Sequence, residues 1–162
     1  MGKEIERKFL VQGQAWRSLA EGTVYRQGYL STEKERVVRV RTIGDTGFLT
    51  IKGITVGSTR LEYEYPIPVT DADEMLDGLC ERPLIEKTRY KIESGGHTWE
   101  IDEFGGENQG LVVAEVELVA ESEAVDLPDW IGEEVTADSR YFNSNLIAHP
   151  GIRYWPLPGW QP

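Results

Sequence analysis

Short stretches of alternating apolar and polar residues recur along this chain of 162 residues. Such alternation is typical of a β-strand with one buried face, because successive side chains point to opposite faces of a sheet. Turn sequences between the stretches, such as Ser94-Gly95-Gly96, are short enough to join antiparallel neighbours. The pattern therefore predicts a mostly antiparallel sheet of eight strands, at about 3–11, 24–31, 36–43, 47–54, 60–68, 84–93, 97–104 and 111–120.

A few helical segments interrupt this pattern. We expect one helix near 70–80, begun by a capping box of Thr70 and Asp73 and packed on the outside of the sheet. Its apolar face would consist of Met75, Leu76 and Leu79. A short turn is expected to start at Pro128, and a second helix is expected to cover 138–148 before a proline stops it.

The sequence predicts one domain over residues 1–149, followed by a Pro- and Trp-rich tail at 150–162. No internal repeat or linker-like stretch precedes that tail, so a second domain would have no place to begin. We expect the two tryptophans of the tail, Trp155 and Trp160, to dock on the domain rather than to form a ligand site.

Charged residues lie on one face of the expected strands, and apolar residues lie on the other. In the strand at 60–68, for example, Glu62 and Glu64 alternate with Tyr63 and Tyr65. The other charges that share a face in this way are Glu4, Glu6, Lys8, Arg39, Arg41, Lys52, Lys87, Arg89, Glu100, Asp102, Glu115 and Glu117. Taken singly, each pair is explained by a solvated sheet face with cross-strand ion pairs, worth about 0.2–1 kcal/mol each.

Taken together, eight such strands favour a different arrangement. A sheet of this size removes its exposed edges by closing into a barrel, and a closed barrel has an inside. If the charged faces point inward, the barrel encloses a polar tunnel and helices cover its apolar outside. Because incompletely paired buried charges are costly, water or a ligand is expected to fill the tunnel. The predicted fold class is mainly β (α+β), a closed eight-stranded antiparallel β-barrel with a few outer and capping helices.

The types of charged group indicate what the tunnel binds. Carboxylates at strand spacing, without histidine or cysteine, suit hard cations that prefer oxygen, such as Mg²⁺ or Mn²⁺. Arginines and lysines that face the same space suit phosphate oxygens. The sequence contains neither a GxxxxGK[ST] nor a GxGxxG loop, so it lacks the usual nucleotide-binding loops. Metal-binding and phosphate-binding groups together indicate a polyphosphate ligand.

Composition narrows the partners and the compartment. The chain has 28 acidic and 17 basic residues, for a formal net charge of −11, which argues against binding to nucleic acid or to anionic membranes. It has no apolar run typical of a signal peptide or a membrane span. A single cysteine, Cys80, excludes an internal disulfide, and with His97 and His149 it cannot complete a four-ligand zinc site. We expect a cytoplasmic protein with Cys80 in its core and both histidines at its surface.

The charged pairs form an ordered series of motifs: EIERK at 4–8, RVR at 39–41, TIK at 50–52, EYE at 62–64, EKTRY at 86–90, EID at 100–102, EVE at 115–117 and DSRYFN at 138–143. This series resembles that of the CYTH superfamily, the triphosphate tunnel metalloenzymes, whose N-terminal signature is ExExK. The RQGYL segment at 26–30 makes the chain most similar to the short bacterial inorganic triphosphatases. The resemblance covers residues 3 to 147, so the tail lies outside it.

The resemblance implies a role for each charged position. The metal ions would be held by Glu4, Glu6, Glu115 and Glu117. The metal and water shell would be completed by Glu62 and Glu64 or by Glu100 and Asp102. The phosphates would be bound by Lys8, Arg39, Arg41, Lys52, Lys87 and Arg89, with a further contact from Arg140. A catalytic pair would consist of Lys8 and Tyr29, and residue chemistry leaves Lys8 open between phosphate contact and acid–base catalysis.

The predicted function is the divalent-metal-dependent hydrolysis of a small-molecule triphosphate, with inorganic tripolyphosphate giving pyrophosphate and phosphate. Thiamine triphosphatases, nucleoside triphosphatases and adenylate cyclases on the same scaffold are alternatives, although the sequence locates no pocket for a base. A non-enzymatic polyphosphate-binding module would bind without turnover. A lipocalin-like barrel for apolar ligands is opposed by the charged faces. The protein is expected to be a monomer or a homodimer.

These assignments also change what the net charge means. The tunnel would contain eight acids and seven bases, which leaves 20 acids and 10 bases on the rest of the protein. The acidity therefore belongs mainly to the exterior. Because a bound triphosphate adds about −4 to −5 near neutral pH, a nearly balanced tunnel cannot neutralise it. Charge alone thus predicts a requirement for divalent metal.

Overall fold

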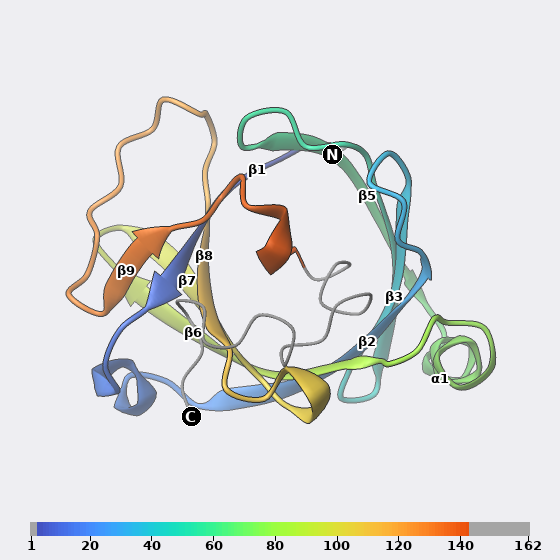
Figure 1. Cartoon of the computed structure of the whole chain (residues 1–162). Coiled ribbons are helices and arrows are strands. Elements are labelled where there is room, and N and C mark those ends of the chain that lie inside the picture. Colours follow the sequence, from blue (N-terminus) through green and yellow to red (C-terminus); the bar gives the residue numbers. More distant parts are fainter. Residues whose placement is uncertain (1–2, 143–162) are drawn as a thin grey trace.

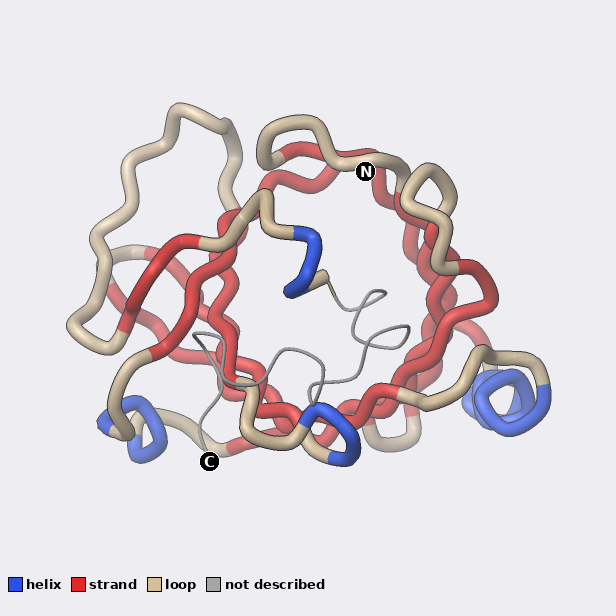
Figure 2. Tube along the Cα trace, viewed as in Figure 1, coloured by secondary structure: helices blue, strands red, loops and turns tan. Residues whose placement is uncertain are grey.

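A computed structural model describes residues 3–142, in which eight strands close into a barrel (Figures 1 and 2). The strands are β1 (Lys3–Val11), β2 (Gly22–Ser31), β3 (Val37–Ile43), β4 (Thr46–Lys52), β5 (Thr59–Ile67), β6 (Ile85–Ser94), β7 (His97–Phe104), β8 (Val112–Glu117) and β9 (Ile131–Glu134). The helices are α1 (Val69–Gly78) and the short 3₁₀-helices η1 (Ala15–Ser18), η2 (Gly106–Asn108) and η3 (Ser139–Tyr141). No helix among residues 3–142 is long and apolar enough to cross a membrane.

The antiparallel strands follow one another around the ring in the order β1-β8-β7-β6-β2-β3-β4-β5, and β5 returns to β1. The closing contact is short, because β5 pairs with β1 at Lys3, Glu4 and Ile5. Beyond this contact β1 pairs with β9, at Phe9 and Val11. The predicted closed barrel is therefore confirmed, with β9 added as an extra strand. The pattern did not predict β9, because its four residues, IGEE, do not alternate.

Tight hairpins fix which side chains face inward. Ser94 pairs with His97 across a two-residue turn. The turn residues Gly95 and Gly96 have φ values of 59° and 81°, which glycine adopts without strain. The turn between β3 and β4 uses Gly44 in the same way, at a φ of 59°. Since a shift of one residue would turn every side chain to the other face, these turns set the alternation of the barrel wall.

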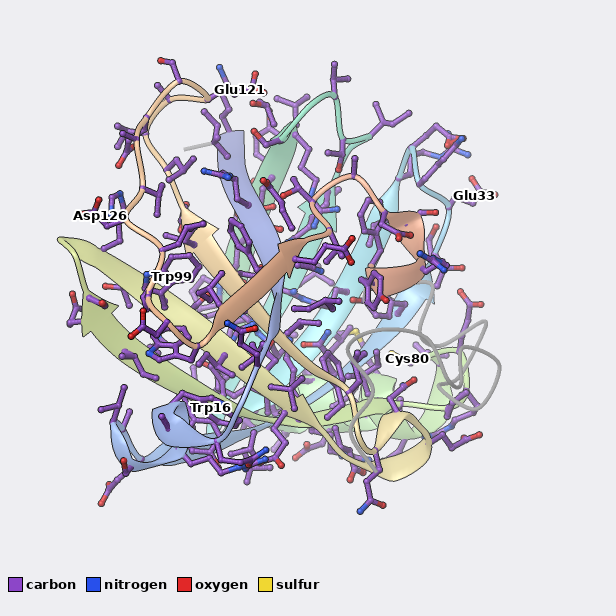
Figure 3. The ribbon with its side chains drawn as sticks, turned by 60° about the vertical axis from the view of Figure 1, so that its left-hand side comes forward. Trp16, Glu33, Cys80, Trp99, Glu121 and Asp126 are labelled. Carbon is purple, nitrogen blue, oxygen red and sulfur yellow. The ribbon has the colours of Figure 1, made fainter. Side chains whose placement is uncertain are left out.

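An aromatic cluster covers one side of the barrel. Trp99 of β7 and Trp16 of η1 are both fully buried on the outside of the sheet (Figure 3). Trp99 packs edge-to-face against Phe9 and Trp130, with ring centroids 5.6 Å and 5.8 Å apart. The segment between β8 and β9 starts its final turn at Pro128, whose carbonyl accepts a hydrogen bond from the Ile131 amide, as predicted.

Helix α1 covers the opposite side of the barrel, over β3 and β4 (Figure 1). It buries Ala72 and Leu76, and Cys80 packs beside them, as predicted for a core thiol. The predicted capping box is wrong, because α1 begins before Thr70 and no side chain caps it. The predicted apolar face is also partly wrong, because Leu79 lies past the end of the helix and is 70% exposed.

The helix predicted at 138–148 is replaced, where the structure describes it, by the single turn of η3. The Asp138 carboxylate accepts a hydrogen bond from the Arg140 amide and so caps this turn. Tyr141 is then buried in an apolar cluster at one end of the barrel, and Phe142 is already extended. The end of the predicted helix, the domain boundary after 149 and the tail with its tryptophans lie outside the described residues, as does His149.

Candidate functional site

The barrel encloses a cavity of about 250 Å³ that is lined mainly by charged side chains. The sequence-predicted site residues in its lining are Glu4, Glu6, Lys8, Tyr29, Arg39, Arg41, Lys52, Glu62, Glu64, Arg89, Glu100, Glu115 and Glu117. The residues that sequence reasoning did not include are Val37, Thr55, Ser58, Arg60, Thr136 and Phe142. The charged strand faces therefore point inward, and the apolar faces point out.

Arg60 is the charged residue that sequence reasoning missed. It lies on β5 two residues before Glu62, so it shares the inward face of that strand. Its Nε atom donates a hydrogen bond to Glu4 Oε1 at 3.0 Å. Extending the alternation back by one step would have found Arg60. The lining residues of the connecting segments, such as Ser58 and Thr136, have no such pattern to reveal them.

Three arginines form what we call the basic wall: Arg39 and Arg41 on β3 and Arg89 on β6. All three residues are buried, yet their side chains reach the cavity. Glu64 Oε1 lies 3.6 Å from Arg39 Nη2 and 3.2 Å from Arg41 Nη2, so one carboxylate serves two guanidiniums. Among residues 3–142, the Nε atoms of Arg39 and Arg41 have no hydrogen-bond partner. Burial, together with the positive charges of Arg39 and Arg89, lowers the pKa of Arg41 to about 10. Such a wall suits an oxyanion.

Arg89 binds Asp102, which in turn binds Lys87, and neither Asp102 nor Lys87 lines the cavity. Its Nε and Nη2 atoms donate to Asp102 at 2.7 Å and 2.8 Å, and Lys87 Nζ lies 2.8 Å from Asp102 Oδ2. Burial lowers the pKa of Lys87 to about 7, although Asp102 acts in the opposite direction. Burial would raise the pKa of Asp102, but Lys87 and Arg89 hold it below its usual range. The structure thus places the predicted site residues Lys87 and Asp102 in a buried ion cluster beneath the cavity.

Three glutamates on β1 and β8 form what we call the acidic wall: Glu6, Glu115 and Glu117. Glu6 lies directly opposite Glu117 in the register of the two strands. Within residues 3–142, Glu6 and Glu117 are the cavity acids without a basic ion-pair partner. Burial and the charges of Glu115 and Glu4 raise the pKa of Glu6 well above its usual value. Burial and three neighbouring carboxylates also raise the pKa of Glu117. The surroundings of both carboxylates therefore disfavour their ionised form.

The remaining acids near this wall are neutralised by bases. Lys52 Nζ lies 3.3 Å from both Glu4 and Glu62, and Arg60 also binds Glu4. Burial would raise the pKa of Glu115, but Lys8 and a hydrogen bond with Glu6 hold it well below its usual range. Because these acids pair with bases, no group of three ligands in residues 3–142 already converges as a metal site. Glu6 and Glu117 nevertheless suit a hard divalent cation, because burial and neighbouring carboxylates raise the pKa of each.

The segment that carries η3 crosses one end of the barrel (Figure 2). Lys8 contacts both this segment and Glu115 of the acidic wall. Its Nζ atom donates to the Tyr141 carbonyl at 3.0 Å and lies 3.5 Å from Glu115 Oε1. The same Nζ atom lies 5.9 Å from the centre of the Phe142 ring. Tyr29 is buried on β2, and its hydroxyl accepts a hydrogen bond from Gln27 at 3.2 Å. Among the described contacts, none joins Lys8 to Tyr29.

Arg140 lies at the edge of this site rather than in the cavity lining. Its guanidinium binds the Asp138 carboxylate, with Nη2 2.6 Å from Oδ2, and 46% of its side chain is exposed. His97 is also outside the cavity, where it starts β7 and binds Glu123, at 2.5 Å from Nε2 to Oε2. With a 16% exposed side chain, His97 is more buried than expected for a surface histidine.

Comparison with known proteins identifies relatives along nearly the whole chain. A family model described as the CYTH domain matches residues 2–149. A protein of Acetivibrio thermocellus named inorganic triphosphatase is 59% identical over 150 residues, covering 93% of this chain and 96% of that protein. A second inorganic triphosphatase, from Nitrosomonas europaea, is 40% identical over 151 residues, covering 88% of this chain and 95% of its own length.

Solved structures show the same architecture. The crystal structure of the inorganic triphosphatase NE1496 superposes with a TM-score of 0.60 and 38% sequence identity, covering 88% of this chain and 96% of that chain. A putative adenylate cyclase from Bacillus halodurans superposes with a TM-score of 0.59, covering 75% of this chain and 84% of that chain. Its identity is 18%, so this second likeness concerns the fold alone.

Proposed function

This chain belongs to the CYTH domain family, and on that premise we propose that it is an inorganic triphosphatase that hydrolyses tripolyphosphate to pyrophosphate and phosphate. The observation that carries the proposal is that one cavity holds both a group of buried arginines and two carboxylates with raised pKa values. The three arginines of the basic wall lie beside Glu64, Asp102 and Glu100, and Glu64 alone is shared by Arg39 and Arg41. Among residues 3–142, Glu6 and Glu117 of the acidic wall have no basic partner, and the pKa of each is raised. A phosphate chain bound with divalent metal would bring an anion to the arginines and a cation to the carboxylates.

We assign the acidic wall, with Glu4, to Mg²⁺ or Mn²⁺. When bound, such an ion neutralises phosphoryl oxygens and lowers the pKa of its water. The basic wall would bind and orient the phosphates, and Lys52 and Arg60 would keep Glu4 ionised. Lys8 would face the phosphate chain with its ammonium group held by the Tyr141 carbonyl. Lys87 and Asp102 would act indirectly, by fixing the guanidinium of Arg89.

A substrate panel with metal titration tests this function. We expect phosphate release from tripolyphosphate with Mg²⁺ or Mn²⁺, loss of release with EDTA, and recovery when metal is added back. Thiamine triphosphate and ATP in the same assay separate the alternative substrates that use this scaffold. Tight tripolyphosphate binding without metal-dependent turnover of any of the three would instead identify a polyphosphate-binding module.

We further propose that the protein works in the reducing cytoplasm, because its one cysteine is a buried free thiol. Its state as a monomer or a homodimer stays a prediction. Light scattering coupled to size-exclusion chromatography would measure the mass in solution and decide between the two states.

A further inference from the structure

An aromatic ring on β2 lies between two arginines of the basic wall. Tyr25 is 4% exposed, and its strand runs between β3 and β6, which carry Arg41 and Arg89. The ring centroid is 5.2 Å from Arg41 Cζ and 4.8 Å from Arg89 Cζ. Two guanidiniums that reach the cavity from neighbouring strands therefore contact one ring.

The two arginines differ in how firmly other groups hold them. Arg89 is fixed by the two-pronged hydrogen bond to Asp102. Arg41 has a 3.2 Å hydrogen bond to Glu64, a carboxylate that it shares with Arg39 and whose side chain is 37% exposed. The Nε atom of Arg41 has no hydrogen-bond partner in the described part of the chain. Two aromatic rings also lie beside the Arg41 guanidinium, with Tyr25 closer than Phe48, whose centroid is 6.0 Å away.

We propose that Tyr25 is a positioning residue whose ring holds Arg41 and Arg89 in place to bind the phosphates of the substrate. The electron-rich face of an aromatic ring attracts cations, and the attraction is strongest where water is excluded. One ring between two guanidiniums also offsets part of their mutual repulsion. The hydroxyl of Tyr25 is not needed for this role. The inference rests on the proposed triphosphatase function, because it names a determinant of substrate affinity in the same cavity.

Two substitutions separate the ring from the hydroxyl. Tyr25→Phe keeps the ring, and we expect its KM for metal–tripolyphosphate to stay within about 2-fold of the wild-type value. Tyr25→Leu removes the ring, and we expect KM to rise about 10-fold while kcat changes much less. Tyr65→Leu is the matched control, because Tyr65 lies on the outside of β5 and is 54% exposed. An unchanged KM in a folded Tyr25→Leu variant, or an equal loss in Tyr25→Phe, would overturn the proposal.

A fluorinated series at position 25 tests the same point without changing shape, in case the leucine variant does not fold. Tyr25 is replaced with phenylalanine and then with increasingly fluorinated phenylalanines. Each added fluorine makes the face of the ring less negative and so weakens its attraction for a cation. We expect KM to rise with each step, and a flat series would contradict a cation–π role. Direct binding of tripolyphosphate to the wild-type protein is measured alongside. If wild type neither binds nor hydrolyses it, the proposed function has failed, whereas turnover with a flat series rejects the role of Tyr25 alone.

Discussion

The basic wall and the acidic wall differ in how far the protein itself satisfies their charges. Each arginine of the basic wall contacts a carboxylate, because Glu64 serves two of them and Asp102 serves the third. In the acidic wall, Glu115 is paired with Lys8, whereas the facing carboxylates of Glu6 and Glu117 have raised pKa values. The basic wall is therefore largely assembled before any ligand binds, whereas we propose that a bound cation completes the acidic wall. We expect the acidic wall to control metal-dependent rate and the basic wall to control substrate affinity.

The largest expected effect is on the acidic wall. Glu117→Gln keeps the shape of the side chain but removes the negative charge that we assign to metal. We expect kcat with saturating metal to fall by a factor on the order of 10² or more, while the thermal unfolding midpoint stays near wild type. Steady-state phosphate release and calorimetry measure the two quantities. Glu86→Gln is the matched control, since Glu86 is exposed on the outward face of β6. Full activity of Glu117→Gln would remove the basis for our metal assignment.

The next largest effect is on the basic wall. Arg41→Lys keeps the charge but loses the forked hydrogen bonds that suit phosphate. We expect KM for tripolyphosphate to rise about 10-fold or more, because a hydrogen bond to a charged group contributes about 1.5–3 kcal/mol. The rate at saturating substrate should change less, in contrast to Glu117→Gln. Arg36→Lys is the control, because Arg36 is exposed and forms an ion pair with Glu33. Figure 3 shows Glu33 at the surface. A fall in kcat with unchanged KM would contradict the assignment of substrate affinity to the basic wall and of metal-dependent rate to the acidic wall.

Alternation with a period of two made most of this site predictable from the sequence. It determines which face a residue occupies, so it placed both Glu100 and Asp102 inside the barrel. It does not determine depth along the barrel, because depth depends on the register between strands. Asp102 pairs with Arg89 in that register and is 1% exposed, whereas Glu100 lines the cavity. For the same reason Lys87 could be assigned to the inside but not to the buried cluster.

Segments that connect strands were the least predictable part of the fold. The turn of η3 is held by the Asp138 cap and by burial of Tyr141 against residues distant in the sequence, such as Leu10. The alternation of residues within a segment does not indicate contacts with residues distant in the sequence. The helix predicted at 138–148 is not formed over its described residues, 138–142, because this tertiary packing outweighs a local helical pattern. Arg60, by contrast, was predictable, because it continues the alternation of β5.

The smallest expected effect is on the stability of the protein without metal. Glu6 has a raised pKa in the folded state, so the folded state holds its proton more tightly than the unfolded state does. The stability that this proton contributes is complete below the ordinary pKa of glutamate and is lost as pH rises through the raised value. Glu6→Gln is neutral at every pH, and its amide can donate to Glu115 as the protonated carboxyl does. In EDTA near neutral pH we therefore expect the variant to unfold about 2–4 °C above wild type, the shift given by about 1 kcal/mol.

Two further measurements connect this shift to the acidic wall. As pH falls toward the ordinary glutamate pKa, the wild-type carboxyl takes up its proton, so the difference between the two unfolding midpoints should shrink. Added Mg²⁺ should raise the midpoint of wild type more than that of Glu6→Gln, because the variant has lost a carboxylate that we assign to metal. Glu86→Gln should show neither effect. Glu6→Gln could instead be less stable than wild type in EDTA near neutral pH. The ionised Glu6 carboxylate would then stabilise the fold, which would contradict the contrast between the two walls.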